Sequence, residues 1–414
     1  MSVADVLPED FSDFTDPFLL ERGIPHDAFR AARRQFPITW VEQAPGAFDG
    51  MSEESGGGYY AVTKHEHVAA ISKNSKDWSA EENGAIIRFQ EGMLREQVEL
   101  QRVILLNQDP PHHTQDRAIV ARGFTPRSIG ELEEVMEQRA YSIVRDAKDL
   151  GRGNFVEQVA AELPLQAIAD LIGVPQEDRH KLFDWSNQML ASVDPDIEGD
   201  PEVASAELLG YAMMMAADRK ANPRDDIITK LINAHDGERG LTDDEFGFFV
   251  IMLAVAGNET TRNAITHGMN AFFDNPDQWE LWKAERPATM VDEVVRWASP
   301  ISVFQRTALN DVEVGGVVIP KGKRAGLFYA SANFDEDVFT DPFRFDITRD
   351  PNPQLGFGGH GAHYCLGANL ARQEIRLIFT ALADLVPDIT RLDQPSRLRH
   401  GWVNGIKDLQ VSYT

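Results

Sequence analysis

One segment near the carboxyl end of the chain holds the residue with the most distinctive chemistry. Cys365 is the only cysteine among 414 residues, and it lies between a glycine-dense loop and a stretch with helical periodicity. Glycines let a backbone pass close to a flat ligand. The free N–H groups and the dipole at a helix start lower the pKa of a thiol. The pattern predicts a stabilised thiolate just before or within the first turn of a helix whose apolar face comprises Ile375, Ile378, Phe379, Leu382, Leu385 and Val386.

Two other interpretations of Cys365 stay open at this point. A lone cysteine beside a loop is most often a buried structural residue. His360, His363 and Cys365 could also hold zinc, although they supply only three ligands and no fourth is obvious. A single cysteine does exclude an internal disulfide framework, a Cys-rich zinc site and an intrachain iron–sulfur cluster.

A second chemical motif follows the most apolar run of the chain, Phe246 to Gly257. That run is apolar on all sides and therefore predicts a buried helix, in which Glu259 and Thr260 need polar partners. Thr260 lies four residues after Ala256, so its hydroxyl can bind the Ala256 carbonyl and open the helix locally. Such a groove can hold dioxygen and a water molecule. The alternative is a buried helix whose polar residues are merely capped.

Two shorter motifs add possible ion contacts. Glu293 and Arg296 are three residues apart on a predicted helix, where they can form an ion pair. The segment from Asp109 is typical of a helix start, with Asp109 as the N-cap and proline at the first helical position. On that helix His113 and Arg117 face the same way and could hold one anion, or they could form a solvated surface.

The elements that must position these residues are mainly helical. Helical spacing dominates from about residue 128 to residue 298. Strands are predicted at Ile38–Glu42, Tyr59–Thr63 and Leu409–Tyr413, and a hairpin over Asp311–Gly322 turns at Gly315-Gly316. The glycine- and serine-rich segment Gly46–Gly58 predicts a surface loop. We therefore expect one domain over residues 1–414, a large helical portion with a minor β portion near both ends.

Composition excludes several classes of function. The formal net charge of −26 argues against DNA or RNA as a partner, because phosphate binding needs a positive field. The first residues are acidic and lack the basic and apolar regions of a signal peptide. The apolar run Phe246 to Gly257 is shorter than the ~20 residues that span a bilayer. We expect a cytoplasmic protein without a membrane anchor.

The motifs together resemble the cytochrome P-450 family. The family's heme-ligand loop reads Phe-Gly-x-Gly-x-His-x-Cys-x-Gly, which Gly361, His363, Cys365 and Gly367 match in place. Phe357 lies one residue further from the cysteine than this pattern asks, and Gly358 occupies the phenylalanine position, so the loop carries one inserted residue. The other motifs, from Asp109 onward, occur in the family's order.

The resemblance implies a fold, a cofactor and a set of roles. It implies heme b with Cys365 as the axial iron ligand, and a thiolate in that place favours cleavage of the O–O bond. Glu259 and Thr260 would activate oxygen in the central helix, with Ala256 and Gly257 beside the heme, and Gly361 in the ligand loop. The heme propionates would be held by His113, Arg117, Arg306 and His363. Glu293 and Arg296 would be structural.

Flanking segments resemble a narrower group, the actinobacterial steroid side-chain monooxygenases, over nearly the whole chain. They are Glu82–Phe89, Val156–Arg179, Gly401–Lys407 and the cysteine loop, whose inserted residue this group shares. The group hydroxylates the terminal side-chain carbon (C26/C27) of cholesterol or cholest-4-en-3-one. The residues expected to bind such a substrate are all apolar, although the same types could form core: Ile86, Ile87, Phe89, Met252, Val255, Val303, Phe304, Trp402 and Val403.

The resemblance also implies the source of electrons. The chain has no flavin or nicotinamide fingerprint, so a separate ferredoxin with its reductase is expected. Candidate docking residues are Arg122, Arg127, Arg372 and Arg376, unless they pair with neighbouring carboxylates. The alternatives are a monooxygenase or peroxygenase acting on another apolar lipid such as a fatty acid, a non-catalytic heme-thiolate protein, and a zinc hydrolase.

Overall fold

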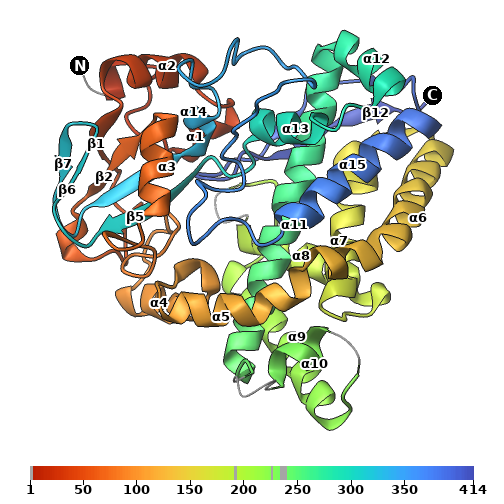
Figure 1. The fold of residues 1–414 in the computed structure, drawn as a ribbon, viewed down its shortest axis with the longest axis horizontal. Coiled ribbons are helices and arrows are strands. Elements are labelled where there is room, and N and C mark those ends of the chain that lie inside the picture. Colours follow the sequence, from red (N-terminus) through yellow and green to blue (C-terminus); the bar gives the residue numbers. More distant parts are fainter. Residues whose placement is uncertain (1–2, 191–193, 225–226, 234–239) are drawn as a thin grey trace.

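Helices form most of the protein. The structure is a computed structural model that describes residues 3–190, 194–224, 227–233 and 240–414. Figure 1 shows a sheet and the amino-terminal elements on one side and a helical mass on the other. The helices are α1 (Pro17–Glu21), α2 (His26–Gln35), α3 (His65–Lys73), α4 (Arg95–Leu100), α5 (His112–Ala121), α6 (Pro126–Leu150), α7 (Glu162–Leu171), α8 (Arg179–Leu190), α9 (Pro201–Ala221), α10 (Ile227–Ile232), α11 (Asp243–Asp274), α12 (Pro276–Glu285), α13 (Met290–Ala298), α14 (Tyr329–Ala332) and α15 (Ala368–Leu385).

Short strands form one larger sheet and three small ones. The five-stranded sheet has the order β1-β2-β8-β5-β3, and only the β2–β8 pair is parallel. The strands are β1 (Ile38–Glu42), β2 (Gly58–Val62), β3 (Trp78–Ser79), β4 (Arg152–Asn154), β5 (Val303–Ala308), β6 (Val312–Val314), β7 (Val317–Ile319), β8 (Arg324–Phe328), β9 (Thr390–Arg391), β10 (Ser396–Arg397), β11 (Ile406–Asp408) and β12 (Gln410–Ser412). Strand β5 leaves the end of α13 and enters this sheet, so it links the two portions of the molecule.

Helix α11 is the axis of the helical portion. Thr242 caps it: the Thr242 hydroxyl accepts from the Glu245 N–H at 3.2 Å, and the Glu245 carboxylate accepts from the Thr242 N–H at 2.8 Å. Most of its 32 residues are buried, because α7, α8, α9, α13 and α15 pack around it. Figure 1 shows α11 running through the middle of the molecule. The predicted buried central helix is confirmed.

Most sequence-predicted elements are present. Strands β1, β2 and β12 fall on the three predicted strands, and β6 and β7 form the predicted hairpin around Gly315-Gly316. Both glycines have positive φ, 55° and 80°, which a tight hairpin turn requires. The predicted helix start at Asp109 is wrong, since α5 begins at His112. The Asp109 carboxylate accepts instead from the Ser79 hydroxyl at 2.5 Å and the Ala80 N–H at 2.8 Å.

The apolar run predicted to be too short for a bilayer lies inside α11. Among the helices of the described ranges, none combines the length and the hydropathy needed to cross a membrane.

Candidate functional site

The cysteine loop packs on the end of α3 and leads into the start of α15. Cys365 precedes α15 by three residues, and its N–H donates to the Phe357 carbonyl at 2.9 Å. The loop turns through two residues with positive φ, Gly358 at 98° and His360 at 61°. These turns accommodate the inserted residue. Phe357 therefore stays packed within the loop, and the Arg372 guanidinium lies 4.4 Å from the centre of its ring.

The glycines of this loop allow a close contact with α3, whereas the sequence predicted a close contact with a flat ligand. A side chain at Gly361 would lie 1.6 Å from the Ser72 carbonyl oxygen, and one at Gly359 would lie 2.4 Å from the Ser72 hydroxyl oxygen. The missing side chains therefore let the loop pack directly on the end of α3. The close approach that the glycines allow is to protein backbone, although Gly361 also borders the cavity described below.

The thiol of Cys365 is accessible from a cavity but enclosed by protein on its other sides. Burial raises the pKa of the Cys365 thiol above its ordinary value. A hydrogen bond from Gly367 and the charges of Arg117 and Arg372 lower it, by less. The prediction that the helix start lowers this pKa is therefore wrong in direction, because burial outweighs the Gly367 hydrogen bond and the two arginine charges.

A surplus of positive charge borders the same cavity. The rings of His113 and His363 lie 4.2 Å apart, and the buried Nε2 of His113 has no hydrogen-bond partner in the described part of the chain. Burial, followed by the charges of Arg117 and Arg306, lowers the pKa of His113 to about 4. Arg117 donates to the Tyr364 carbonyl at 2.5 Å, which ties α5 to the cysteine loop. Two arginines and two neutral histidines meet here, so the edge of the cavity fits an anionic group.

The polar motif of α11 borders the same cavity. The Thr260 hydroxyl donates to the Ala256 carbonyl at 2.7 Å, as the spacing predicts. Glu259 is buried; its Oε1 is paired with Arg262 and accepts from Asn263 at 2.9 Å. Its Oε2 has no partner among the described residues. Glu259 and Thr260 both border the cavity.

This cavity has a volume of about 1230 Å³, and its wall extends from Cys365 to residues of α4 and α9. Seven residues predicted to bind substrate line it: Ile86, Phe89, Met252, Val255, Phe304, Trp402 and Val403. Ala256 and Gly257 line it as well, and Gly257 also leaves space for the Ile168 side chain of α7, which a Cβ would approach to 2.6 Å.

Ile87 and Val303 are corrections to that prediction. Both are fully buried and pack together in the core beneath the sheet. Val303 precedes Phe304 in β5, and successive strand residues point to opposite faces. Ile86 borders the cavity, whereas the next residue, Ile87, is buried in that core. In both of these pairs only one of the two neighbouring apolar residues borders the cavity.

Glu293 and Arg296 form a fully buried bidentate pair, with N–O distances of 2.7 and 2.8 Å. Arg296 also donates to the carbonyls of Asn333 and Pro342, both at 2.9 Å. The pair joins α13 to the segment that leads to the cysteine loop, and it lies outside the wall of the cavity.

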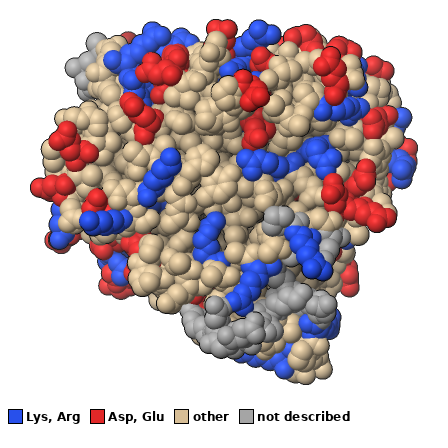
Figure 2. All heavy atoms as spheres, viewed as in Figure 1, with Lys and Arg blue, Asp and Glu red and all other residues tan. Residues whose placement is uncertain are grey.

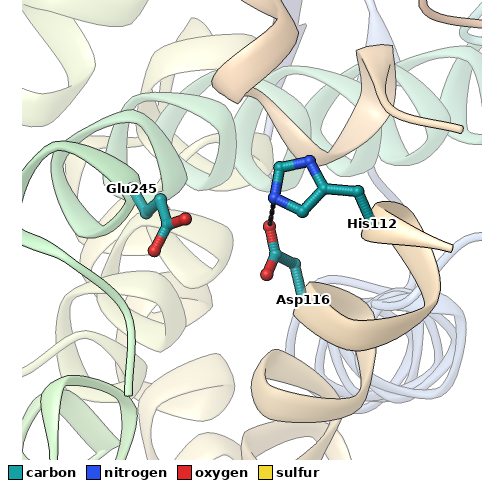
Figure 3. Close-up of side chains that lie close together, drawn as sticks. All are labelled: His112, Asp116 and Glu245. Carbon is teal, nitrogen blue, oxygen red and sulfur yellow. Dashed lines mark ion pairs between the residues drawn. The ribbon is translucent and has the colours of Figure 1, made fainter. Parts of the chain in front are cut away.

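The zinc interpretation of the cysteine loop is wrong. Across the described ranges, the one group of three metal-ligating side chains is His112, Asp116 and Glu245, not His360, His363 and Cys365. His360 stacks on Tyr364 instead. Figure 3 shows His112 and Asp116 in contact, with Glu245 facing them from α11. Protein partners already engage these carboxylates: His112 and Gln108 contact Asp116, each at 3.1 Å, and Glu245 caps α11.

Several cavity residues were missed by the sequence reasoning. Glu374 of α15 is buried at the cavity, and burial raises its pKa to about 8. Arg88 and His400 also line the wall. The sequence did contain a signal for Glu374, because it is a charged residue on the otherwise apolar face of α15. Arg88 immediately precedes Phe89, and His400 lies two residues before Trp402, so their nearness in sequence to predicted pocket residues was the available signal.

The fold and the site define a class of protein: the chain belongs to the cytochrome P450 family. The family model described as Cytochrome P450 matches residues 288–383. The chain is 57% identical over 407 residues to a steroid C26-monooxygenase of Rhodococcus jostii (strain RHA1), covering 98% of this chain and 85% of that one. It is 39% identical to a methyl-branched lipid omega-hydroxylase of Mycobacterium tuberculosis, covering 96% and 93%.

A solved structure agrees over the same length. A Mycobacterium marinum cytochrome P450 in complex with pseudoionone matches with a TM-score of 0.88 and 35% identity, covering 99% of this chain and 100% of that chain. The predicted mainly α cytochrome P-450 fold is confirmed.

Proposed function

We propose that this protein is a heme-thiolate monooxygenase that hydroxylates the terminal side-chain carbon (C26) of cholesterol or cholest-4-en-3-one. The observation that carries the proposal is one cavity bordered by Cys365, by the hydroxyl of Thr260 and by an apolar wall. The likeness to the Rhodococcus jostii steroid C26-monooxygenase supports the choice of substrate.

The residues around the cavity fit heme b. The Cys365 thiol opens into the cavity, and iron coordination deprotonates a thiol despite a raised pKa. His113, Arg117, Arg306 and His363 would hold the propionates, and the unpartnered His113 Nε2 would gain an acceptor. When bound, a thiolate-ligated heme supplies dioxygen activation and oxygen insertion into a C–H bond.

The residues of this chain would supply protons and exclude water. Oxygen activation consumes two protons at a buried site. The Thr260 hydroxyl holds a proton at Oγ1 beside the cavity. The Oε2 of Glu259, which has no partner among the described residues, would take up a proton from water and pass it on to replace that proton. Arg262 and Asn263 hold Glu259 in place through its other oxygen. The apolar wall excludes water and leaves few polar groups to misdirect a large neutral lipid.

Electrons would come from a separate ferredoxin served by a reductase, docking near the cysteine loop. Figure 2 shows Lys and Arg side chains around a largely uncharged centre, with Asp and Glu mostly toward the rim. Arg372 is engaged by Asp292 at 3.0 Å and by the Phe357 ring, and Arg376 pairs with Glu133 at 2.7 Å. Both arginines are therefore paired with carboxylates, and Arg372 also supports the cysteine loop. The exposed Arg122 and Arg376 are the docking candidates that can be changed without disturbing that loop.

Charge reversal tests the docking face. Arg122→Glu with Arg376→Glu should slow reduction by a ferredoxin at low salt, where screening is weakest, and leave reduction by dithionite unchanged. Arg22→Glu with Arg34→Glu, on the amino-terminal elements, is the matched control. Equal ferredoxin-driven rates for both double variants and the wild type would remove this face from consideration.

A second candidate substrate is a methyl-branched lipid, oxidised at its terminal carbon, as the name of the Mycobacterium tuberculosis relative states for that protein. Titration of the purified protein with cholest-4-en-3-one and with a methyl-branched fatty acid, followed by the optical difference spectrum, separates the two. The proposal expects a tenfold or greater preference for the steroid. A preference for the fatty acid would support the second candidate.

A further inference from the structure

His400 is a buried residue of the cavity wall that the proposed chemistry does not use. It lies in the loop between β10 and β11, two residues before Trp402. Its Nδ1 accepts from the Trp402 N–H at 3.3 Å and from the Val403 N–H at 3.1 Å. The Leu190 carbonyl at the end of α8 lies near the ring and acts to raise its pKa, by less than burial lowers it.

The two hydrogen bonds at Nδ1 define one state of the ring. Two N–H donors at Nδ1 require that this nitrogen carry no hydrogen, so the hydrogen is on Nε2, where it can reach the Leu190 carbonyl. Burial lowers the pKa of His400 to about 4, which keeps the ring neutral at physiological pH.

The ring connects two walls of the cavity. The cavity is lined on one wall by Leu190 of α8 and on the other by Trp402 and Val403 of the loop. The carbonyl of Trp402 is held from the other side by the Ser302 N–H and hydroxyl, both at 2.8 Å. His400 is therefore the partner that holds the N–H side of the same turn, and its ring lies 4.8 Å from the Trp402 ring.

We propose that His400 is a positioning residue, which sets Trp402 and Val403 against Leu190 and so determines which substrate carbon reaches the reacting end of the cavity. The inference rests on the proposed function for the identity of the substrate. A substrate that touches protein mainly through apolar contacts is oriented by the shape of the wall, so a small displacement of Trp402 changes which carbon is oxidised.

Three variants distinguish the role of the acceptor at Nδ1 from that of the N–H group at Nε2. His400→Asn keeps an acceptor near the position of Nδ1 but cannot reach Leu190, His400→Gln can reach Leu190 but shifts the acceptor, and His400→Leu removes both. His26→Leu is the matched control, since burial lowers the pKa of His26 to about 4, yet its ring packs on Phe334 and Phe343 away from the cavity. Each protein is loaded with heme and supplied with ferredoxin, reductase and cholest-4-en-3-one.

The readouts are the distribution of oxygenated carbons, the coupling of NADH to product, and KM and kcat separately. We expect His400→Leu to raise the share of products oxidised elsewhere at least twofold and to raise KM severalfold, with His400→Asn close to wild type. A wild-type distribution and KM in His400→Leu, with an intact ferrous–CO band, would overturn the proposal. If His400→Leu does not fold, identical distributions in His400→Asn and His400→Gln overturn it.

Failure of the proposed function gives a different result. A wild-type enzyme that makes no steroid product contradicts the steroid assignment. The role of His400 is then measured on the branched fatty acid with the same variants, where an unchanged product distribution again counts against it.

Discussion

The most informative single change is Thr260→Ala. The Thr260 hydroxyl donates to the Ala256 carbonyl at 2.7 Å and borders the cavity, so the variant loses one hydrogen bond and one proton donor. The lost hydrogen bond costs about 1 kcal/mol of stability, a small part of the ~5–15 kcal/mol typical of a domain. The fold should therefore persist, and the effect should be confined to proton delivery.

The expected effect is a fall in coupling rather than in electron consumption. A tenfold slower proton transfer corresponds to an activation free energy higher by about 1.4 kcal/mol. It changes a product-to-peroxide ratio of about nine to one into a ratio of about one to one. Since a positioned proton donor contributes ~10²–10⁴-fold, coupling should drop to half or less. The assay measures NADH consumed, peroxide released and hydroxylated product in the same sample.

The matched control is Thr266→Ala. Thr266 makes the same bond on the same helix, from its hydroxyl to the Arg262 carbonyl at 2.8 Å, but it is not part of the cavity wall. Thr260→Ser should retain most of the coupling because it keeps the hydroxyl. Equal coupling in Thr260→Ala and Thr266→Ala would refute the role given to Thr260.

Three further predictions concern the ligand, the buried ion pair and pH. Cys365→Ser should lose the strongly red-shifted Soret band of the ferrous–CO complex, and a variant that keeps it would remove Cys365 as the iron ligand. Arg296→Lys cannot reproduce the bidentate contact to Glu293, so the free energy of unfolding of this variant should fall by about 3–5 kcal/mol. Denaturant titration measures this change, and a loss below about 1 kcal/mol would contradict the expectation. Burial raises the pKa of Glu374 from 4.5 to about 8 in the folded protein. Between pH 4.5 and pH 8 the carboxyl is therefore ionised in the unfolded chain but protonated in the folded one, so the free energy of unfolding falls as the pH rises through this range. Glu374→Gln should therefore be the more stable protein at pH 8 and show a flatter pH profile, while an unchanged slope argues that Glu374 is already ionised.

The sequence predicted features that depend on local spacing. The i to i+4 relation of Ala256 and Thr260 and the Gly315-Gly316 turn appear in the structure as expected, because each is set by residues close in the chain. The same is true of the pairing of Glu293 with Arg296. Resemblance to the family added the long-range part, namely that His113, Arg306 and Cys365 border one cavity.

Features that depend on packing between distant segments were missed or misjudged. Asp109 was expected to cap its own helix, but Ser79 and Ala80 compete for its carboxylate. The close packing of Gly361 on Ser72 and the cavity wall shared by Leu190 and Trp402 involve segments far apart in sequence, and the periodicity of the sequence does not indicate such contacts. The pKa of Cys365 was misjudged because burial is also a long-range property.

The central claim is tested most directly by the products of one reconstituted turnover assay. The heme-loaded wild-type enzyme is supplied with ferredoxin, reductase, NADH and cholest-4-en-3-one, and the products are separated and identified by mass spectrometry. The account predicts a single oxygen atom on the terminal side-chain carbon, with the Cys365→Ser enzyme making no such product. Oxygen on the steroid rings, or no steroid product from an enzyme that oxidises a branched fatty acid, would contradict it.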